Sequence, residues 1–141
     1  MFQGQSVLVI IPAFNEADHI GRVVRNIPSW VDHIVVVDDG SRDLTVARAQ
    51  ETGRVFELVR HGVNRGVGAA IISGYKAAIA RGVDIAAIMA GDDQMRPDEL
   101  VDLVSPLLAG EADYVKGTRM RHPGLRDTMP SWRRLGNAGL T

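Results

Sequence analysis

The sequence contains no cysteine and no run of about 18 apolar residues, the length that a membrane-spanning helix needs. The absence of cysteine excludes disulfide bonds, iron–sulfur clusters and thiolate zinc sites, and fits a reducing compartment. The absence of a long apolar run indicates that the chain as given does not cross a bilayer. The amino terminus also lacks the basic segment of a signal peptide, since its apolar run stops at Pro12. We therefore expect a cytoplasmic protein.

The sequence also lacks an excess of either charge. Sixteen Lys and Arg residues stand against seventeen Asp and Glu residues, which gives a net charge of -1 at pH 7. This balance does not favour a nucleic-acid partner. With 45% hydrophobic and 23% charged residues, the composition is typical of a globular domain. Internal repeats, low-complexity tracts and linkers are absent, so residues 1–141 are expected to form one domain.

Continuous apolar runs predict the strands, and apolar residues spaced three and four apart predict the helices. Buried strands are expected at Val7–Ile11, His33–Val37, Val55–Val59 and Ile85–Met89, with a weaker fifth strand at Tyr114–Lys116. Helices are expected from about Glu16 to Ile27 after an Asn15 cap, from an Asp43 cap to about Thr52, at Ala69–Arg81 and at Pro97–Leu108. Proline cannot donate to a sheet, so Pro12 is expected to end the first strand. The alternation of strands and helices predicts an α/β fold with a mainly parallel sheet and helices on both faces.

Polar loops follow three of the expected strands, at Pro12–Glu16, Asp38–Ser41 and Gly91–Gln94. The carboxyl ends of parallel strands meet at one edge of a sheet, where ligands bind. Asp and Gln oxygens suit a hard cation such as Mg²⁺ or Mn²⁺. Taken alone, Asp92 and Asp93 fit better as solvated turn residues that cap the next helix. Taken together, the three loops favour a site for a nucleotide diphosphate and a cation.

A glycine-rich loop with Gly62, Gly66 and Gly68 precedes the third expected helix. Only the first two glycines of a G-x-G-x-x-G dinucleotide motif are matched, because Ile71 occupies the third position and the loop follows the third strand. The Gly-Lys-Ser/Thr ending of a P-loop is absent as well. Two interpretations remain open. The glycines permit a tight turn and close helix packing, or their backbone amides lie near a phosphate at the helix amino end.

The pair of Asp38 and Asp39 also resembles the paired acids of a phosphoacceptor receiver domain, a non-enzymatic α/β module of similar size. A receiver domain needs the acid pair after its first strand and the phosphorylated Asp after its third. Here the acidic residues follow the second and fourth expected strands. The order of elements therefore argues against a receiver domain.

Five segments, IPAFNE, VVVDDGS, NRGVGAAIISGY, GDDQMRPDEL and VKGTR, follow the order found in family-2 glycosyltransferases. They cover nearly the whole chain, which resembles the amino-terminal, nucleotide-sugar-binding part of such an enzyme with the GT-A fold. The polyprenyl (dolichyl) phosphate mannosyl- and glucosyltransferase branch is the most similar. The resemblance implies transfer of a sugar, with inversion, from a GDP- or UDP-sugar to an acceptor. The implied acceptor is a polyprenyl phosphate at the membrane surface, and the implied cofactor is Mg²⁺ or Mn²⁺.

The resemblance also implies roles for individual residues. The nucleotide-binding residues would be Pro12, Ala13, Phe14, Glu16, Val37, Asp39 and Gly91. Asp92 and Gln94 would hold the metal on the donor diphosphate, and Asp92 and Arg119 would be the catalytic residues. Arg119 and Arg133 would approach the acceptor phosphate.

Two features depart from the family's pattern. Ala90 replaces the first Asp of the D-x-D motif, which removes a carboxylate and leaves Asp93 as a substitute, so weaker metal binding or activity is expected. The chain also ends at Thr141, within an expected helix, where the family continues into acceptor-side and often membrane-associated segments. We therefore expect a truncated chain whose membrane association depends on segments beyond it. The alternative function is a nucleotide-binding module without turnover.

Overall fold

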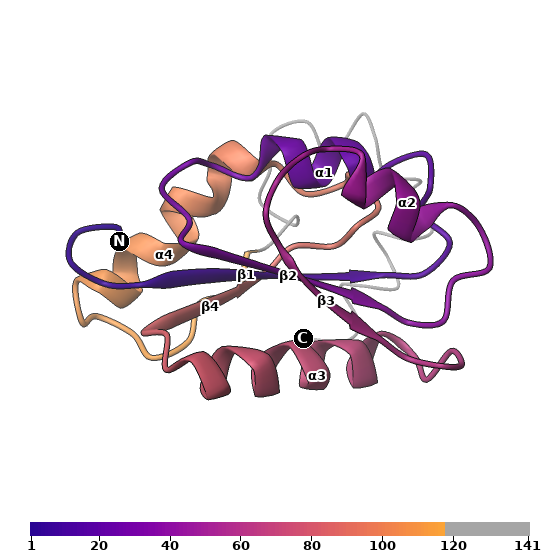
Figure 1. Ribbon diagram of the computed structural model, residues 1–141. Coiled ribbons are helices and arrows are strands. Elements are labelled where there is room, and N and C mark those ends of the chain that lie inside the picture. Colours follow the sequence, from indigo (N-terminus) through magenta and orange to yellow (C-terminus); the bar gives the residue numbers. More distant parts are fainter. Residues whose placement is uncertain (118–141) are drawn as a thin grey trace, which may run out of the picture.

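The computed structural model describes residues 1–117 and places a four-stranded sheet between layers of helices (Figure 1). The strands are β1 (Val7–Ala13), β2 (His33–Asp38), β3 (Glu57–Arg60) and β4 (Ile85–Ile88). Their order across the sheet is β3-β2-β1-β4, and every pairing is parallel. The predicted α/β class and the mainly parallel sheet are confirmed.

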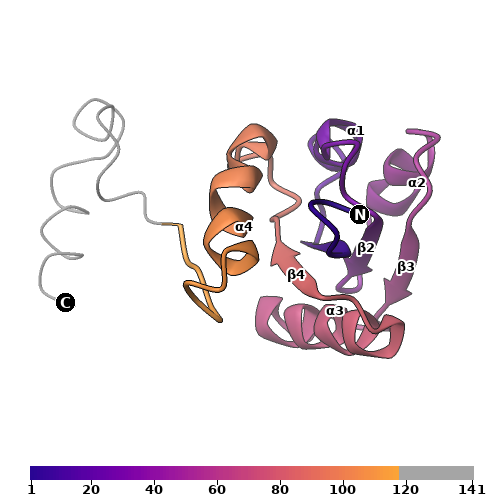
Figure 2. The ribbon, with the colours of Figure 1, turned by 90° about the vertical axis from the view of Figure 1, so that its left-hand side faces the viewer.

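Helices cover both faces of the sheet, as predicted. Helices α1 (Ile20–Asn26) and α2 (Thr45–Gln50) lie on one face, and α3 (Val67–Arg81) lies on the other (Figure 1). A 3-10 turn, η1 (Pro97–Glu99), leads into α4 (Leu100–Leu108), which lies beside β4 (Figure 2). Within residues 1–117, no helix has the length and apolar character that a membrane span requires.

Strand β1 is buried along its whole length, because helices cover it on both sides. Its side chains alternate between the two helical layers. Val9 and Ile11 pack in the cluster that contains the buried residues of α1, whereas Leu8 and Ile10 pack in the cluster that contains those of α3. This explains why the strand reads as a continuous apolar run. The central strand thereby fixes the positions of both layers.

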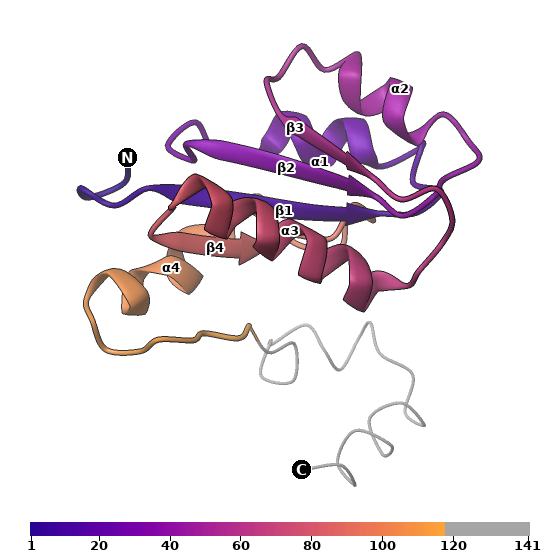
Figure 3. The ribbon, with the colours of Figure 1, turned by 60° about the horizontal axis from the view of Figure 1, so that its bottom comes forward.

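Helix α3 approaches β1 closely because the side chains between them are small. Ala70, Gly74 and Ala78 are buried at four-residue intervals along the helix, which lies against the sheet in Figure 3. A Cβ atom built on Gly74 would lie only 2.2 Å from Cγ2 of Ile10. A larger residue at position 74 would therefore push the helix and the strand apart.

The expectation that Pro12 ends the first strand is wrong, because β1 continues to Ala13. The carbonyl of Pro12 accepts a hydrogen bond from the backbone N–H of Gly91, with 3.1 Å between N and O. Pro12 therefore directs its backbone polar groups toward the side of β4, which has already ended at Ile88. Proline has no N–H to donate, but no residue of β4 pairs with Pro12, so no hydrogen bond of the sheet is lost at this position.

The start of the first helix also differs from the prediction. Helix α1 begins at Ile20, with His19 rather than Asn15 at the N-cap position. Asn15 has a left-handed backbone, with φ of 54°, and its Oδ1 accepts a hydrogen bond from the backbone N–H of Arg42 at 2.9 Å. Its side chain therefore joins two loops instead of capping a helix.

Three further boundaries shift, and the fifth strand is absent. Helix α2 ends at Gln50 rather than near Thr52, and α3 begins at Val67. Strand β3 starts only at Glu57, and Val55, predicted to begin it, is 93% exposed. Tyr114–Lys116 forms no strand, so that prediction is wrong. Tyr114 is 75% exposed, and such a short segment buries too little apolar surface to repay its ordering.

Candidate functional site

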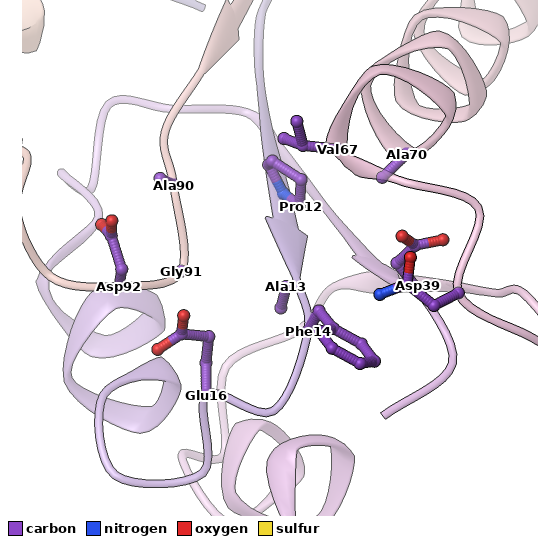
Figure 4. Close-up of a pocket in the computed structure, with 11 residues that line it drawn as sticks. Pro12, Ala13, Phe14, Glu16, Asp39, Val67, Ala70, Ala90, Gly91 and Asp92 are labelled. Carbon is purple, nitrogen blue, oxygen red and sulfur yellow. The ribbon is translucent and has the colours of Figure 1, made fainter. Parts of the chain in front are cut away.

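A cavity of about 280 Å³ lies at the carboxyl edge of the sheet, beside the start of α3 (Figure 4). Ligands of open α/β sheets bind at this edge. The lining residues come from all three predicted polar loops, from the glycine-rich loop and from α3: Pro12, Ala13, Phe14, Glu16, Asp39, Asn64, Val67, Ala70, Ala90, Gly91 and Asp92. The structure therefore brings the separate loops together around one space.

Backbone hydrogen bonds attach two of these loops to opposite sides of β1. The N–H of Asp39 donates to the carbonyl of Ala13 at 2.9 Å, and the N–H of Gly91 donates to the carbonyl of Pro12 at 3.1 Å. A Cβ atom on Gly91 would lie 3.2 Å from both Ala13 Cβ and Pro12 O. Glycine at position 91 therefore allows the acidic loop to lie close against the end of β1.

The loop that carries Glu16 is fixed by the segment before α2. The backbone N–H of Glu16 donates to Thr45 Oγ1 at 2.8 Å, and the N–H of Asn15 donates to Ser41 Oγ at 3.0 Å. Phe14, in the same loop, is 41% exposed at the edge of the cavity. An exposed aromatic ring beside a cavity offers a flat apolar surface to a ligand.

The carboxylates of Glu16 and Asp92 lie on the same side of the cavity (Figure 4). Burial raises the pKa of Glu16 above its usual value of 4.5, and the negative charge of Asp92 raises it further. Two carboxylates that repel each other form an oxygen donor set suited to a hard divalent cation, so the residues present fit Mg²⁺ or Mn²⁺. Residues 1–117 contain no cluster of three or more His, Cys, Asp or Glu side chains placed to bind a metal.

The two aspartates of the acidic loop after β4 have different surroundings: Asp92 lines the cavity, and Asp93 pairs with α1. Asp92 Oδ1 accepts a hydrogen bond from the backbone N–H of Gln94 at 3.1 Å, and Asp92 lines the cavity. Asp93 has a left-handed backbone, with φ of 59°, and its Oδ2 lies 2.9 Å from Nη1 of Arg22 on α1. Asp93 is therefore committed to an ion pair outside the cavity lining.

Asp39 lines the cavity with a carboxylate that already has several partners. Its Oδ1 accepts hydrogen bonds from His61 Nδ1 at 2.6 Å and the Arg65 N–H at 3.0 Å, and its Oδ2 accepts one from the Gly66 N–H at 2.8 Å. Burial raises the pKa of Asp39, but these three hydrogen bonds outweigh burial and hold the pKa below its usual 3.8. Asp39 is therefore ionised at neutral pH.

Most of the predicted nucleotide-binding residues line this cavity, namely Pro12, Ala13, Phe14, Glu16, Asp39 and Gly91, and so does the predicted metal ligand Asp92. Val37 was also predicted to bind the nucleotide, but it does not line the cavity. Its side chain is fully buried in the core beneath α3. Gln94 is exposed and lies outside the cavity lining. Arg119 and Arg133 lie outside the residues that the structure describes.

Four lining residues, Asn64, Val67, Ala70 and Ala90, were not among the predicted site residues. Ala90 was noted only as the position of the missing first Asp of the D-x-D motif. The glycine spacing indicated the loop before α3, but not which of its side chains face a ligand. Gly66 occupies the N-cap position of α3 with φ of 89°, which favours the tight-turn interpretation of the glycines. Proximity to a phosphate remains a prediction.

A second hollow of about 340 Å³ lies between α1 and α2. Its lining is mostly charged and consists of Ala17, Asp18, Gly21, Arg22, Arg25, Arg48 and Glu51. Arg48 and Glu51 form an exposed ion pair across one side of it, with 2.9 Å between Nη1 and Oε2. None of the predicted site residues lines this hollow.

Residues 8–137 match the profile described as Glycosyl transferase family 2. The chain belongs to glycosyl transferase family 2. The family predicted from the sequence is confirmed, and the receiver-domain alternative is excluded.

Two curated relatives illustrate the likeness. The UDP-N-acetylglucosamine--dolichyl-phosphate N-acetylglucosaminyltransferase of Methanococcus voltae is 33% identical over 96% of this chain and 60% of its own length. The polyprenol monophosphomannose synthase of Mycolicibacterium smegmatis is 37% identical over 93% of this chain and 51% of its own length. The chain therefore spans between one half and two thirds of each relative.

Solved structures share the fold as well. The glucosyl-3-phosphoglycerate synthase of Mycobacterium tuberculosis superimposes with a TM-score of 0.63 and 31% identity, over 77% of this chain and 41% of that one. That structure contains Mn²⁺, UDP and glucosyl-3-phosphoglycerate, and another structure of the same enzyme contains Mg²⁺ and UDP. The predicted GT-A fold is thereby confirmed.

Proposed function

We propose that this chain forms the donor-binding side of a glycosyltransferase and binds a nucleotide diphosphate sugar at the cavity described above. The supporting observation is that Glu16, Asp39 and Asp92, distant in the sequence, line one cavity at the carboxyl edge of the sheet. Its volume of about 280 Å³ is just below the range for ligand pockets, roughly 300–1,000 Å³. The cavity would therefore hold part of a sugar nucleotide, and the rest would extend over the exposed edge at Phe14.

The charges suggest how the donor lies. The ionised carboxylate of Asp39 is suited to accept hydrogen bonds from ribose hydroxyls or from N–H groups of the base. Glu16 and Asp92, at the other side of the cavity, would repel the diphosphate unless a cation lay between them. Glu16 and Asp92 would hold Mg²⁺ or Mn²⁺ there. Gln94, the second ligand expected from the sequence, follows Asp92 by two residues and would add its amide oxygen from outside the cavity lining. When bound, the ion neutralises negative charge on the departing diphosphate.

We propose that the acceptor is a polyprenyl phosphate at the membrane surface. The two relatives described above support the lipid phosphate, since one is named for dolichyl phosphate and the other for polyprenol monophosphomannose. A phosphate monoester has a second pKa of about 6, so an oxygen is already ionised at neutral pH and no protein base is needed. That oxygen bonds to the anomeric carbon while the bond to the donor diphosphate breaks, with inversion, and the electron pair leaves with the diphosphate. Arg119 and Arg133 are expected to bind the acceptor phosphate.

A second candidate function is nucleotide binding without turnover. Ala90 lines the cavity at the position where the family's D-x-D motif has its first Asp, so one carboxylate is missing from the proposed metal site. Weak metal binding would leave the diphosphate a poor leaving group.

Titration calorimetry of the 141-residue chain with UDP and with GDP, each with and without Mn²⁺, tests the proposal. We expect one of the two nucleotides to bind more tightly in the presence of Mn²⁺ than in its absence. Asp92→Ala should abolish this gain in affinity. Asp113→Ala is the matched control, because Asp113 is exposed and lies outside both cavities. Binding of neither nucleotide would refute the proposal. Release of nucleotide diphosphate from UDP-glucose, UDP-N-acetylglucosamine or GDP-mannose in the presence of polyprenyl phosphate would separate a transferase from a binding module.

A further inference from the structure

His61 is the middle member of a chain of three polar side chains, of which Asp39 lines the cavity. Its Nδ1 lies 2.6 Å from Asp39 Oδ1, and its Nε2 lies 2.9 Å from Oγ of Ser73 on α3. The imidazole and the carboxylate are both almost fully buried, with 5% and 4% of their side-chain surfaces exposed. Because an ionised carboxylate only accepts hydrogen bonds, the hydrogen between His61 and Asp39 lies on Nδ1.

Asp39 links His61 to the glycine-rich loop. Besides His61, its carboxylate holds the backbone amides of Arg65 and Gly66. An ionised carboxylate has about four acceptor positions. The three protein donors therefore leave about one position for a ligand. The orientation of the Asp39 carboxylate in the cavity wall therefore depends on all three donors, His61, Arg65 and Gly66.

The glycine-rich loop in turn positions one wall of the cavity. Asn64 lies between His61 and Gly66, and Val67 and Ala70 follow in the first turn of α3. The loop also packs closely against the turn that follows β2, since a Cβ atom on Gly40 would lie 2.7 Å from the backbone carbonyl carbon of Val63. A change in the Asp39 carboxylate would therefore move this wall.

Ser73, His61 and Asp39 are hydrogen-bonded in the same succession as the Ser, His and Asp of a hydrolase triad. The position of the serine, however, does not suit a nucleophile. Ser73 lines neither of the two cavities formed by residues 1–117 that are described above. A nucleophilic oxygen must reach the substrate carbon, and here the partly buried Ser73 hydroxyl contacts His61 Nε2 outside the cavity lining. The chain of side chains is therefore suited to orientation rather than to covalent chemistry.

We propose that His61 is a positioning residue of the nucleotide site. By donating from Nδ1, it holds the Asp39 carboxylate in the orientation that both binds the glycine-rich loop and presents its remaining acceptor position to the nucleoside. The inference rests on the proposed function, because it assigns Asp39 to the nucleoside end of the donor. His61 then affects nucleotide affinity through Asp39, without touching the nucleotide itself.

Two substitutions at position 61 separate the two hydrogen bonds of the imidazole. Asparagine has an N–H donor at the same number of bonds from Cα as Nδ1, so His61→Asn retains the bond to Asp39 and loses the bond to Ser73. Glutamine has its donor at the position of Nε2, so His61→Gln reaches Ser73 and loses the bond to Asp39. Ser73→Ala removes the outer bond alone. His33→Gln is the control, because His33 begins β2 at the opposite edge of the sheet.

Nucleotide affinity is measured by calorimetry, thermal unfolding reports stability, and amide hydrogen exchange reports the Arg65 and Gly66 amides. We expect His61→Gln to weaken binding about tenfold, the equivalent of one charge-assisted hydrogen bond. His61→Asn and Ser73→Ala should stay within about threefold of the unchanged chain. Faster exchange at Gly66 is expected in His61→Gln alone, even at equal melting temperatures.

Three results would overturn the inference. If His61→Asn and His61→Gln lose affinity equally, in proportion to lost stability, the role of His61 is structural only. If the Gly66 amide exchanges at the same rate in His61→Gln as in the unchanged chain, His61 does not fix the loop, whatever the nucleotide result. If the unchanged chain binds neither nucleotide, the proposed function fails first and the inference fails with it. Slow Gly66 exchange in that case would identify the hydrogen-bond network as purely structural.

Discussion

Arg22 on α1 forms an ion pair with Asp93 in the loop after β4, with 2.9 Å between Nη1 and Oδ2. Asp93 has a φ of 59°, a left-handed conformation that costs a residue with a side chain roughly 1 kcal/mol. The ion pair therefore holds Asp93 in a conformation that is unfavourable by itself. It also keeps the adjacent Asp92 at the cavity, because the two residues share a tight turn.

Replacing Arg22 with alanine should weaken Mn²⁺-dependent nucleotide binding. The expected loss is about threefold, consistent with the modest contribution of a partly exposed ion pair. Arg48→Ala is the matched control, since it breaks the Arg48–Glu51 ion pair of equal length in the second hollow. Equal losses in the two variants, measured by calorimetry at one salt concentration, would show that the effect is general electrostatics rather than loop position.

The convergence of Glu16, Asp39 and Asp92 could be predicted from the sequence because it follows from topology. Buried parallel strands are continuous apolar runs, and whatever follows each strand must lie at the same edge of the sheet. The spacing of apolar residues therefore places the acidic loops together without any knowledge of side-chain contacts. The same reasoning identified the layers of helices.

The parts that the sequence did not predict depend on contacts between distant residues. Pro12 stays within β1 because its backbone faces the side where β4 has ended, and no local pattern encodes that. Asn15 was expected to cap a helix, but it accepts a hydrogen bond from Arg42, 27 residues away. The lining role of Asn64 follows from the Asp39 carboxylate holding the loop, which residue spacing does not reveal.

Gly74→Ala should destabilise the fold. The added methyl group would lie 2.2 Å from Ile10 Cγ2 in a fully buried part of the core. Overpacking of this kind costs about 1–3 kcal/mol, more than the roughly 1 kcal/mol that alanine gains over glycine within a helix. Gly68→Ala is the control on the same helix, where a Cβ atom meets nothing within 4 Å, and it should stabilise the chain slightly. Urea unfolding measures both, and a neutral Gly74→Ala would contradict the close packing of α3 on β1.

The stability supplied by Asp39 should depend on pH. Its pKa in the folded chain lies below the usual 3.8, so its contribution is complete above that value and is lost as the pH falls through the folded pKa. At pH 7, Asp39→Asn should cost about 1.5–3 kcal/mol, the contribution of hydrogen bonds to a charged group. The difference from the unchanged chain should shrink below pH 3.8. Urea unfolding across this range measures it, with Asp113→Asn as an exposed control that should show no such trend.

Glu16→Gln should separate stability from binding. The pKa of Glu16 is raised by burial and by the charge of Asp92, so its ionised form opposes folding increasingly as the pH rises through the folded pKa. At pH 7 the neutral glutamine should raise the melting temperature by about 1–2 °C, since a partly solvated group contributes a fraction of a kcal/mol. Nucleotide binding with Mn²⁺ should weaken in the same variant. Asp18→Asn, in the exposed neighbouring turn, should do neither, and a less stable Glu16→Gln would contradict the repulsion between Glu16 and Asp92.

Ala90→Asp should strengthen metal-dependent nucleotide binding. Ala90 lines the cavity beside Gly91 and Asp92, so an aspartate there adds a carboxylate where the family's D-x-D motif has its first acid. Affinity for a hard cation rises with the number of charged oxygen ligands, and a gain of about tenfold in the presence of Mn²⁺ is expected. The gain should vanish when a chelator removes the metal, because a fourth acid in the cavity then only repels the diphosphate.

Ala90→Asn is the control that isolates the charge, since asparagine has the size of aspartate and one carbonyl oxygen but remains neutral. A metal-dependent gain in Ala90→Asp alone would place the cation against this loop, in agreement with the proposed orientation of the donor. If the unchanged chain, Ala90→Asp and Ala90→Asn all bind the nucleotide with the same affinity in the presence of Mn²⁺, the proposed orientation of the donor is contradicted. The diphosphate would then have to lie away from Asp92, because a carboxylate added beside a bound cation cannot leave its affinity unchanged.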